Sequence, residues 1–223
     1  LALLGEQGGW PLTMFCTPKG EPFWGGTYFP AEPRYGRPAF PDVLRGVAAA
    51  WRERKTDIAD NVQALKAGIA ELALPRGGAF DASAIELAAA RIAGAMDPVR
   101  GGFVGAPKFP NVPALKLLWR VSRRTRGEKQ RALVLRSLDR MAEGGIYDHL
   151  GGGFARYSTD EEWLAPHFEK MLYDNAQLIE IYTDAWRATR QPLYAERIAE
   201  TVAWLEREMI IPEGGAFAAA LDA

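Results

Sequence analysis

The pattern of apolar and polar residues starts as strand-like and becomes helical along this 223-residue chain. Residues 12–16 form a short apolar run, and a second run follows over residues 22–29. Between them, Thr17-Pro18-Lys19-Gly20 has proline and glycine where a type I turn favours them. The pattern predicts a β-hairpin, with Gly25-Gly26 as a bulge or a close approach of backbones.

A helical period follows this hairpin. Pro41-Asp42 suits a helix start, and apolar residues recur every seven positions from Leu44 through Trp51 to Leu72. We predict a helix over residues 41–72, packed on a sheet or on a neighbouring helix. Residues 74–78 read Leu-Pro-Arg-Gly-Gly, which is typical of a linker.

The remainder of the chain is helical and is divided by glycine-rich phrases. The predicted helices cover residues 81–96, 112–125, 128–142, 166–189 and 193–209. The phrases that recur between them are Gly101-Gly102-Phe103, Gly152-Gly153-Phe154 and Gly214-Gly215-Ala216-Phe217. Their period matches two helices and two loops, which predicts stacked helical hairpins. Such an array can close into an α/α-toroid, but five helices are too few, so we expect a fragment with exposed apolar faces.

Composition excludes several partners. The chain is 48% hydrophobic and 25% charged with a net charge of −1, which is typical of a globular protein and not of a polyanion binder. The basic segment 120–131 is interpreted as a solvated corner between helices, so we predict no nucleic-acid partner. No apolar run is long enough to cross a membrane, so no membrane association is expected. Cys16 is the one cysteine and is predicted to be a core residue, so a cytoplasmic protein without a disulfide is expected.

Titratable and aromatic side chains concentrate in residues 147–178. On the predicted helix 166–189, four polar residues fall on one face: His167, Lys170, Asp174 and Gln177. Two readings of this face stay open, a solvated helix surface and the wall of a cavity. Aromatic rings with a few charged groups suit the binding of sugars.

Candidate roles follow from that second reading. Asp148 and Asp174 are the preferred acids for glycoside chemistry, and His167 is the candidate proton shuttle for epimerisation. The candidate substrate-binding residues are Tyr147, His149, Arg156, Trp163, Lys170, Tyr173 and Gln177.

No metal or cofactor is expected. The two histidines lie 18 residues apart and lack the spacing of a helical ligand pair. Residues 150–154 read Leu-Gly-Gly-Gly-Phe, without the lysine and the spacing of a phosphate-binding loop. Hairpin-loop glycines that need a positive φ explain this run better.

Four stretches carry a family resemblance: GGWPLTMFCTPKGEPFWGGTYFP from residue 8, GAPKFP from residue 105, GGIYDHLGGGFARYSTDEEWLAPHFEKMLYDNAQL from residue 144, and GGAFAAALDA at the end. They resemble the spermatogenesis-associated protein 20 family. The resemblance implies a mixed fold, with the second half of a thioredoxin-like α/β domain over residues 1–75 and a linker over 76–80. Residues 81–223 would be the first hairpins of a truncated toroid related to six-hairpin glycosidases and sugar 2-epimerases.

The resemblance also implies roles. Pro11 would hold the cis-proline position of a thioredoxin-like fold and face a redox motif upstream of this chain. A toroid would place the polar face of His167, Lys170, Asp174 and Gln177 on the wall of a cavity, and the expected ligand is a small carbohydrate. The alternatives are a thiol-redox protein and a non-catalytic binding protein that uses the toroid as a platform. Oligomeric state is left open.

Overall fold

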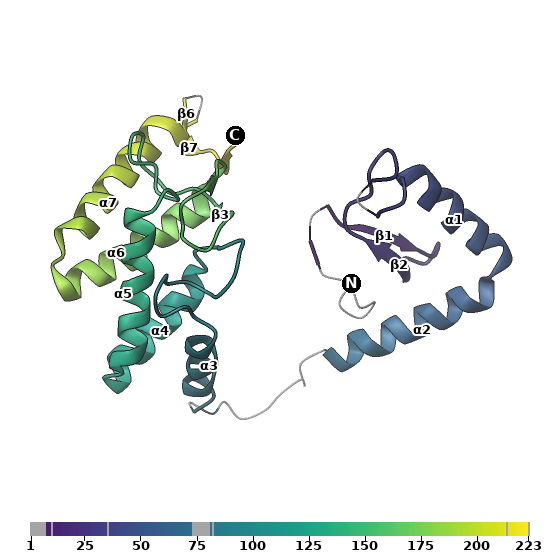
Figure 1. Ribbon diagram of the computed structural model, residues 1–223, viewed down its shortest axis with the longest axis horizontal. Coiled ribbons are helices and arrows are strands. Elements are labelled where there is room, and N and C mark those ends of the chain that lie inside the picture. The colour runs from purple at the N-terminus through teal and green to yellow at the C-terminus, as the bar shows by residue number, and fades with distance from the viewer. Residues whose placement is uncertain are drawn as a thin grey trace. The chain divides into compact units, whose positions relative to one another are not determined.

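A computed structural model describes residues 8–9, 11–34, 36–72, 81, 83–212 and 214–222. The chain separates into two compact units, residues 1–79 and 80–223 (Figure 1). The predicted linker 76–80 lies outside the described residues, so the predicted domain boundaries stay a prediction.

In the first unit a β-hairpin packs against two helices. Strand β1 (Thr13–Cys16) pairs antiparallel with β2 (Pro22–Gly26), and the Gly20 N–H donates to the Thr17 carbonyl at 2.8 Å. The predicted hairpin and its turn are therefore confirmed. The backbones do approach closely at Gly25, where an added Cβ would lie 2.7 Å from the Thr13 carbonyl oxygen, but the register irregularity lies between Phe15 and Cys16.

The single helix predicted for residues 41–72 is wrong. The structure has α1 (Phe40–Glu53) and α2 (Lys55–Leu72), with Arg54 between them at φ −125° and ψ 48°. Because the helix is interrupted at Arg54, the apolar residues do not all lie on one helix face. Trp51 is partly exposed, whereas Ile58 is buried in a small core. Cys16, predicted to be a core residue, is exposed.

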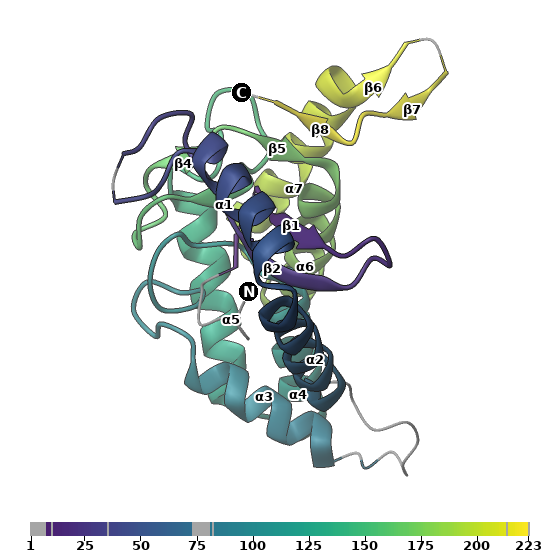
Figure 2. The same ribbon diagram turned by 90° about the vertical axis from the view of Figure 1, so that its right-hand side faces the viewer.

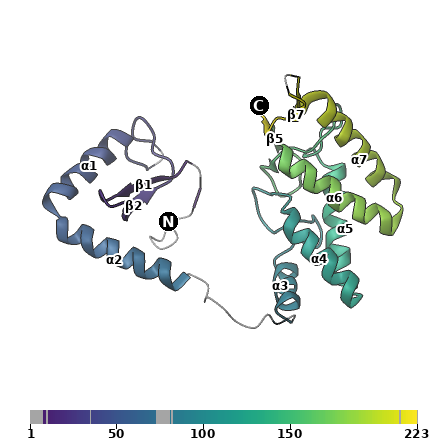
Figure 3. The same cartoon turned by 180° about the vertical axis from the view of Figure 1, so that it is seen from behind.

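Helical hairpins build the second unit. Its described part contains α3 (Ser83–Gly94), α4 (Val112–Thr125), α5 (Glu128–Glu143), α6 (Leu172–Thr189) and α7 (Pro192–Trp204), the last continued by the π-helical turn η2 (Leu205–Met209). Helix α4 packs against α3, α5 and α6, and α6 packs against α7 (Figures 1 and 3). Side chains without solvent exposure fill the space between the helices, among them Leu118, Val134, Leu138, Met141, Leu178 and Ile181.

The recurring glycine phrase forms the same turn three times. Phe103, Phe154 and Phe217 each pair antiparallel with the residue seven positions earlier, which lies just after the end of a helix. The glycines before the first two phenylalanines have positive φ, for example +66° at Gly102 and +82° at Gly153. The sequence repeat is therefore a structural repeat, and the glycines serve the turn as predicted.

Three two-residue ladders hold the loops of this unit. Strand β3 (Tyr157–Ser158) pairs with β4 (Pro166–His167), and β6 (Ile210–Ile211) pairs with β7 (Ala216–Phe217). Strand β5 (Lys170–Met171) pairs with β8 (Ala220–Leu221), as Figure 2 shows. Four candidate site residues lie in these ladders or in the loops next to them: Arg156, Trp163, His167 and Lys170.

Candidate functional site

The segment before α6 decides which candidate residues can act together. Residues 166–171 were predicted to be the first turns of a helix, but they are extended, and α6 begins at Leu172. Their backbone pairs with Tyr157–Ser158 and with Ala220–Leu221, and these long-range bonds replace the intrahelical ones. The predicted polar helix face is therefore wrong: His167 and Lys170 do not share it with Asp174.

Lys170 instead enters the interior. Its Nζ lies 2.7 Å from Asp148 Oδ2, donates to the Gly152 carbonyl at 2.8 Å, and lies 4.9 Å from the ring centroid of Trp204. Asp148 Oδ1 accepts the N–H groups of Leu150 and Gly151. The two side chains thus tie the glycine turn to the segment before α6.

The same arrangement occurs one repeat earlier. Lys108 is buried, its Nζ lies 3.5 Å from Asp97 Oδ2, and it sits over the ring of Trp163. Asp97 Oδ1 accepts the N–H groups of Val99 and Arg100, as Asp148 does for Leu150 and Gly151. Because both repeats build this motif, the Asp148–Lys170 pair has a structural role of its own.

The pKa of Asp148 agrees with this structural role. Burial alone would raise the pKa of this carboxyl, but the Gly151 N–H and the Lys170 ammonium outweigh burial and lower it to about 2. A carboxyl with this pKa is ionised at neutral pH and is a poor proton donor. We therefore keep Asp174 rather than Asp148 as the candidate acid.

Two predicted substrate-binding aromatics lie in the core. Trp163 has no exposed surface, and its Nε1–H donates to the Arg100 carbonyl at 2.9 Å. Tyr147 is 1% exposed and its hydroxyl donates to Glu200, which also binds Arg197. These two side chains offer almost no surface to a ligand, and Lys170 is 9% exposed with its ammonium paired to Asp148.

Arg156, Tyr173 and Asp174 come together at the start of α6. Arg156 Nη1 donates to Glu169 Oε2 at 2.7 Å, and this hydrogen bond raises the pKa of the arginine. Among the described residues the buried Nε of Arg156 has no hydrogen-bond partner, whereas Tyr173 is half exposed. We name Arg156, Glu169, Tyr173 and Asp174 the α6 cluster.

Asp174 has an unusual pKa within this cluster. Burial raises its pKa to about 6, and the positive charge of Arg156 offsets only part of that effect. The negative charge of Glu169 raises it further. The carboxyl therefore gains and loses a proton near neutral pH, as a general acid or base requires.

His167 belongs to a separate group of rings. It stacks on Tyr157, with 4.7 Å between ring centroids, and Tyr157 also contacts Phe109 at 4.7 Å. Within the described residues, no hydrogen bond, ion pair or ring contact joins these rings to the α6 cluster. The role of His167 as a proton shuttle stays a prediction.

The remaining candidates are His149, Gln177 and Pro11. His149 is exposed, with Nε2 3.0 Å from the Gly144 carbonyl oxygen, and Gln177 donates to the Tyr173 carbonyl one turn earlier on α6. Pro11 is exposed, and its peptide bond with Trp10 lies outside the described residues.

Glu169 is one of the carboxyls that the sequence offers for acid–base chemistry, but only the tertiary structure shows its pairing with Arg156. Asn175 was missed from the sequence. Asn175 has no exposed surface and binds both the N–H and the carbonyl of Phe154. Aligning the glycine phrases would have found the paired aspartates, because Asp97 and Asp148 each lie six residues before the phenylalanine.

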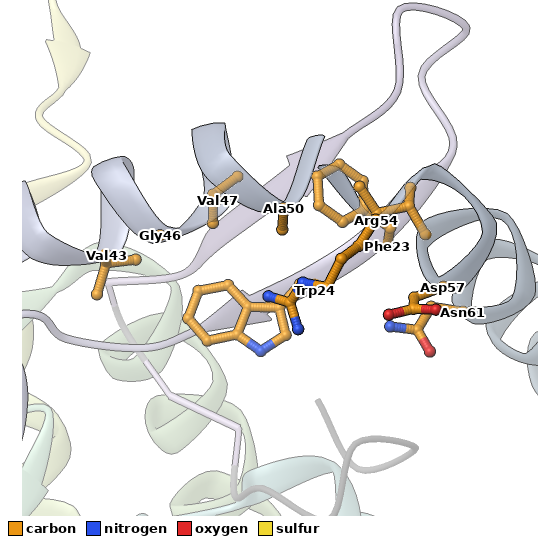
Figure 4. A pocket seen from close by; sticks show the side chains of 10 residues that line it. Phe23, Trp24, Val43, Gly46, Val47, Ala50, Arg54, Asp57 and Asn61 are labelled. Carbon is orange, nitrogen blue, oxygen red and sulfur yellow. The ribbon is translucent and has the colours of Figure 1, made fainter. Parts of the chain in front are cut away.

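A further hollow lies in the first unit. A cavity of about 390 Å³ lies between β2 and the two helices. Figure 4 shows Val43, Val47 and Ala50 along its apolar side, and Arg54, Asp57 and Asn61 near its polar end.

No metal centre and no membrane span are found in the described ranges. No three histidine, cysteine, aspartate or glutamate side chains gather there as they would around a metal ion. No helix in that part of the chain is both long and apolar enough to cross a bilayer.

Comparisons with known proteins address both units. A family model, Thioredox_DsbH, described as a protein of unknown function, DUF255, matches residues 1–70. A solved structure of a sugar epimerase from a ruminal bacterium aligns with a TM-score of 0.53 and 17% identity, over 63% of this chain and 40% of that one. This likeness concerns the fold alone. The predicted fold class is confirmed: a thioredoxin-like α/β segment is followed by helical hairpins of an α/α-toroid.

Curated relatives match nearly the whole chain. It is 37% identical over 221 residues to spermatogenesis-associated protein 20 of Mus musculus, and 36% identical over 223 residues to that of Homo sapiens. The alignments cover 95% of this chain and 28% of each relative. The chain therefore belongs to the spermatogenesis-associated protein 20 family.

Proposed function

We propose that the second unit binds a carbohydrate at the α6 cluster and that Asp174 exchanges a proton with it. The observation that carries the proposal is the grouping of two carboxyls, Glu169 and Asp174, around the single guanidinium of Arg156. Acid–base chemistry on sugars usually uses two carboxyl groups whose environments give them different pKa values. The fold shared with a sugar epimerase is in keeping with this class of ligand.

Each residue of the cluster has a role in this proposal. Asp174, with a pKa of about 6, donates a proton to a sugar oxygen or accepts one from a hydroxyl. Arg156 and Glu169, whose side chains are 36% and 20% exposed, bind sugar hydroxyls. The half-exposed ring of Tyr173 offers a face for a sugar ring.

Calorimetric titration of the chain with monosaccharides and disaccharides tests the proposal. Asp174→Asn keeps the size of the side chain and removes the proton exchange, and Arg156→Gln removes the cation between the carboxyls. We expect saturable binding of at least one sugar, weakened about tenfold or more in Arg156→Gln because charged hydrogen bonds are lost.

Asp184→Asn is the matched control, because Asp184 lies on the same helix and outside the α6 cluster. Incubation of the longer relatives with sugars that bind, followed by NMR, tests glycoside hydrolysis and 2-epimerisation. Absence of binding across the panel, or equal loss in the Asp184→Asn control, would contradict the proposal.

A further inference from the structure

A cavity of about 540 Å³ opens at the far end of α6. It is lined by the end of α4, the start of α5 and the last turns of α6. Asp174 and Arg187 are 13 residues apart on α6, which corresponds to about 20 Å along the helix axis. The cavity is therefore separate from the α6 cluster and independent of the proposed carbohydrate site.

The lining of this cavity carries excess positive charge. Four arginines contribute to it, Arg123, Arg126, Arg131 and Arg187, against two carboxylates, Glu128 and Asp184. Within the described residues, none of these four guanidinium groups makes an ion pair or a hydrogen bond. The neighbouring Arg124, which does not line the cavity, pairs with Glu86 instead. Guanidinium groups without counterions repel each other, and a bound anion removes this repulsion by accepting charged hydrogen bonds from them.

A buried donor in the same lining is also without a partner. Trp119 is 2% exposed and lines the cavity, and its Nε1–H has no acceptor in the part of the chain that the structure describes. Buried indole N–H groups usually have an acceptor, because leaving such a donor unpaired costs free energy. Because this nitrogen has almost no solvent-accessible surface, an anion in the cavity would contact the guanidinium groups and not the indole N–H.

The start of α5 adds positive potential. This helix has 16 residues, its N-cap is Gly127, and no side chain caps it. Its first N–H groups lack intrahelical partners, and the helix dipole places partial positive charge at this end. The N-terminus of α5 adds to the positive potential of the arginines, and it does not form the proposed site by itself.

We propose that this cavity binds the phosphate group of a small phosphorylated metabolite. A phosphate dianion matches the excess of two positive charges in the lining, and its oxygens accept paired N–H bonds from planar guanidinium groups. The cavity is a single hollow between helix ends and not an extended basic stripe, which suits a small ligand better than a nucleic acid.

Titration of the chain with inorganic phosphate, at constant ionic strength set with sodium chloride, tests the proposal. The double variant Arg123→Gln/Arg187→Gln removes two lining guanidinium groups. We expect its phosphate affinity to fall about tenfold or more for each arginine lost.

The matched control is Arg120→Gln/Arg124→Gln, which removes the same amount of charge from α4, outside the cavity lining. It should bind phosphate as the unchanged chain does, and circular dichroism checks that every variant is folded. Equal weakening in this control, displacement of phosphate by chloride at the same ionic strength, or no saturable phosphate binding would each overturn the proposal.

Discussion

Lys108 and Lys170 hold equivalent places in two successive repeats of the second unit. Each buried ammonium pairs with the aspartate that follows a helix end, and each lies over a tryptophan ring. The aspartate in turn binds two backbone N–H groups of the glycine turn. The repeat therefore contains a polar motif that joins the turn to the segment before the next helix.

Asp148→Asn should destabilise the chain by about 2 kcal/mol, because Lys170 then keeps its charge in the interior without a carboxylate. Urea unfolding measures the change. Asp97→Asn should have a similar effect in the earlier repeat. The double variant Asp148→Asn/Lys170→Met should recover much of the loss, since it removes both charges; a double variant as unstable as Asp148→Asn would argue against the motif.

The lowered pKa of Asp148 also predicts acid sensitivity. The folded chain binds this proton less tightly than the unfolded chain does, so the stabilisation is present above pH 3.8 and is lost as the pH falls through about 2. Unfolding midpoints between pH 5 and pH 2 should therefore fall less steeply in Asp148→Asn. A slope unchanged by the substitution would contradict this.

Asp174 should have the opposite pH dependence. Its pKa is raised from 3.8 to about 6, so the folded chain binds the proton more tightly, and stability falls as the pH rises through that window. Asp174→Asn should remove this loss and be more stable than the unchanged chain at pH 7. Urea midpoints at pH 4 and pH 7 measure it, and equal slopes in the variant and the unchanged chain would contradict it.

Asn175→Ala should cost about 3 kcal/mol of stability. The amide of Asn175 binds Phe154 through both its N–H and its carbonyl, so the substitution leaves buried backbone groups without partners. Gln177→Ala, at a half-buried position of the same helix, should change the unfolding free energy by about 0.5 kcal/mol or less. Similar effects of the two substitutions would show that Asn175 does not anchor the turn.

The glycine turns can be tested by separating backbone strain from crowding. A Cβ at Gly102 would collide with Trp163, whereas Gly105 has positive φ and open space around it. Gly105→Ala should cost about 1 kcal/mol, from backbone strain alone. Gly102→Ala should cost about 3 kcal/mol, because crowding of the buried ring is added. Thermal unfolding compares the two variants, and equal costs would exclude the crowding.

Local sequence signals predicted much of this fold. Proline and glycine placed the turn after β1, apolar periodicity located α4 and α5 closely, and the recurring Gly-Gly-aromatic phrase revealed the repeat. These features depend on neighbouring residues and on backbone preferences, which a sequence displays directly.

The candidate site was decided by contacts between distant segments. The helical spacing of His167, Lys170 and Asp174 was real, but pairing of the backbone with β3 and β8 kept the first two out of α6. The sequence by itself determined which residue types gather before α6. Only the tertiary structure decided that Lys170 would be buried against Asp148, and that Arg156 and Asp174 would meet, because burial and long-range pairing set these positions.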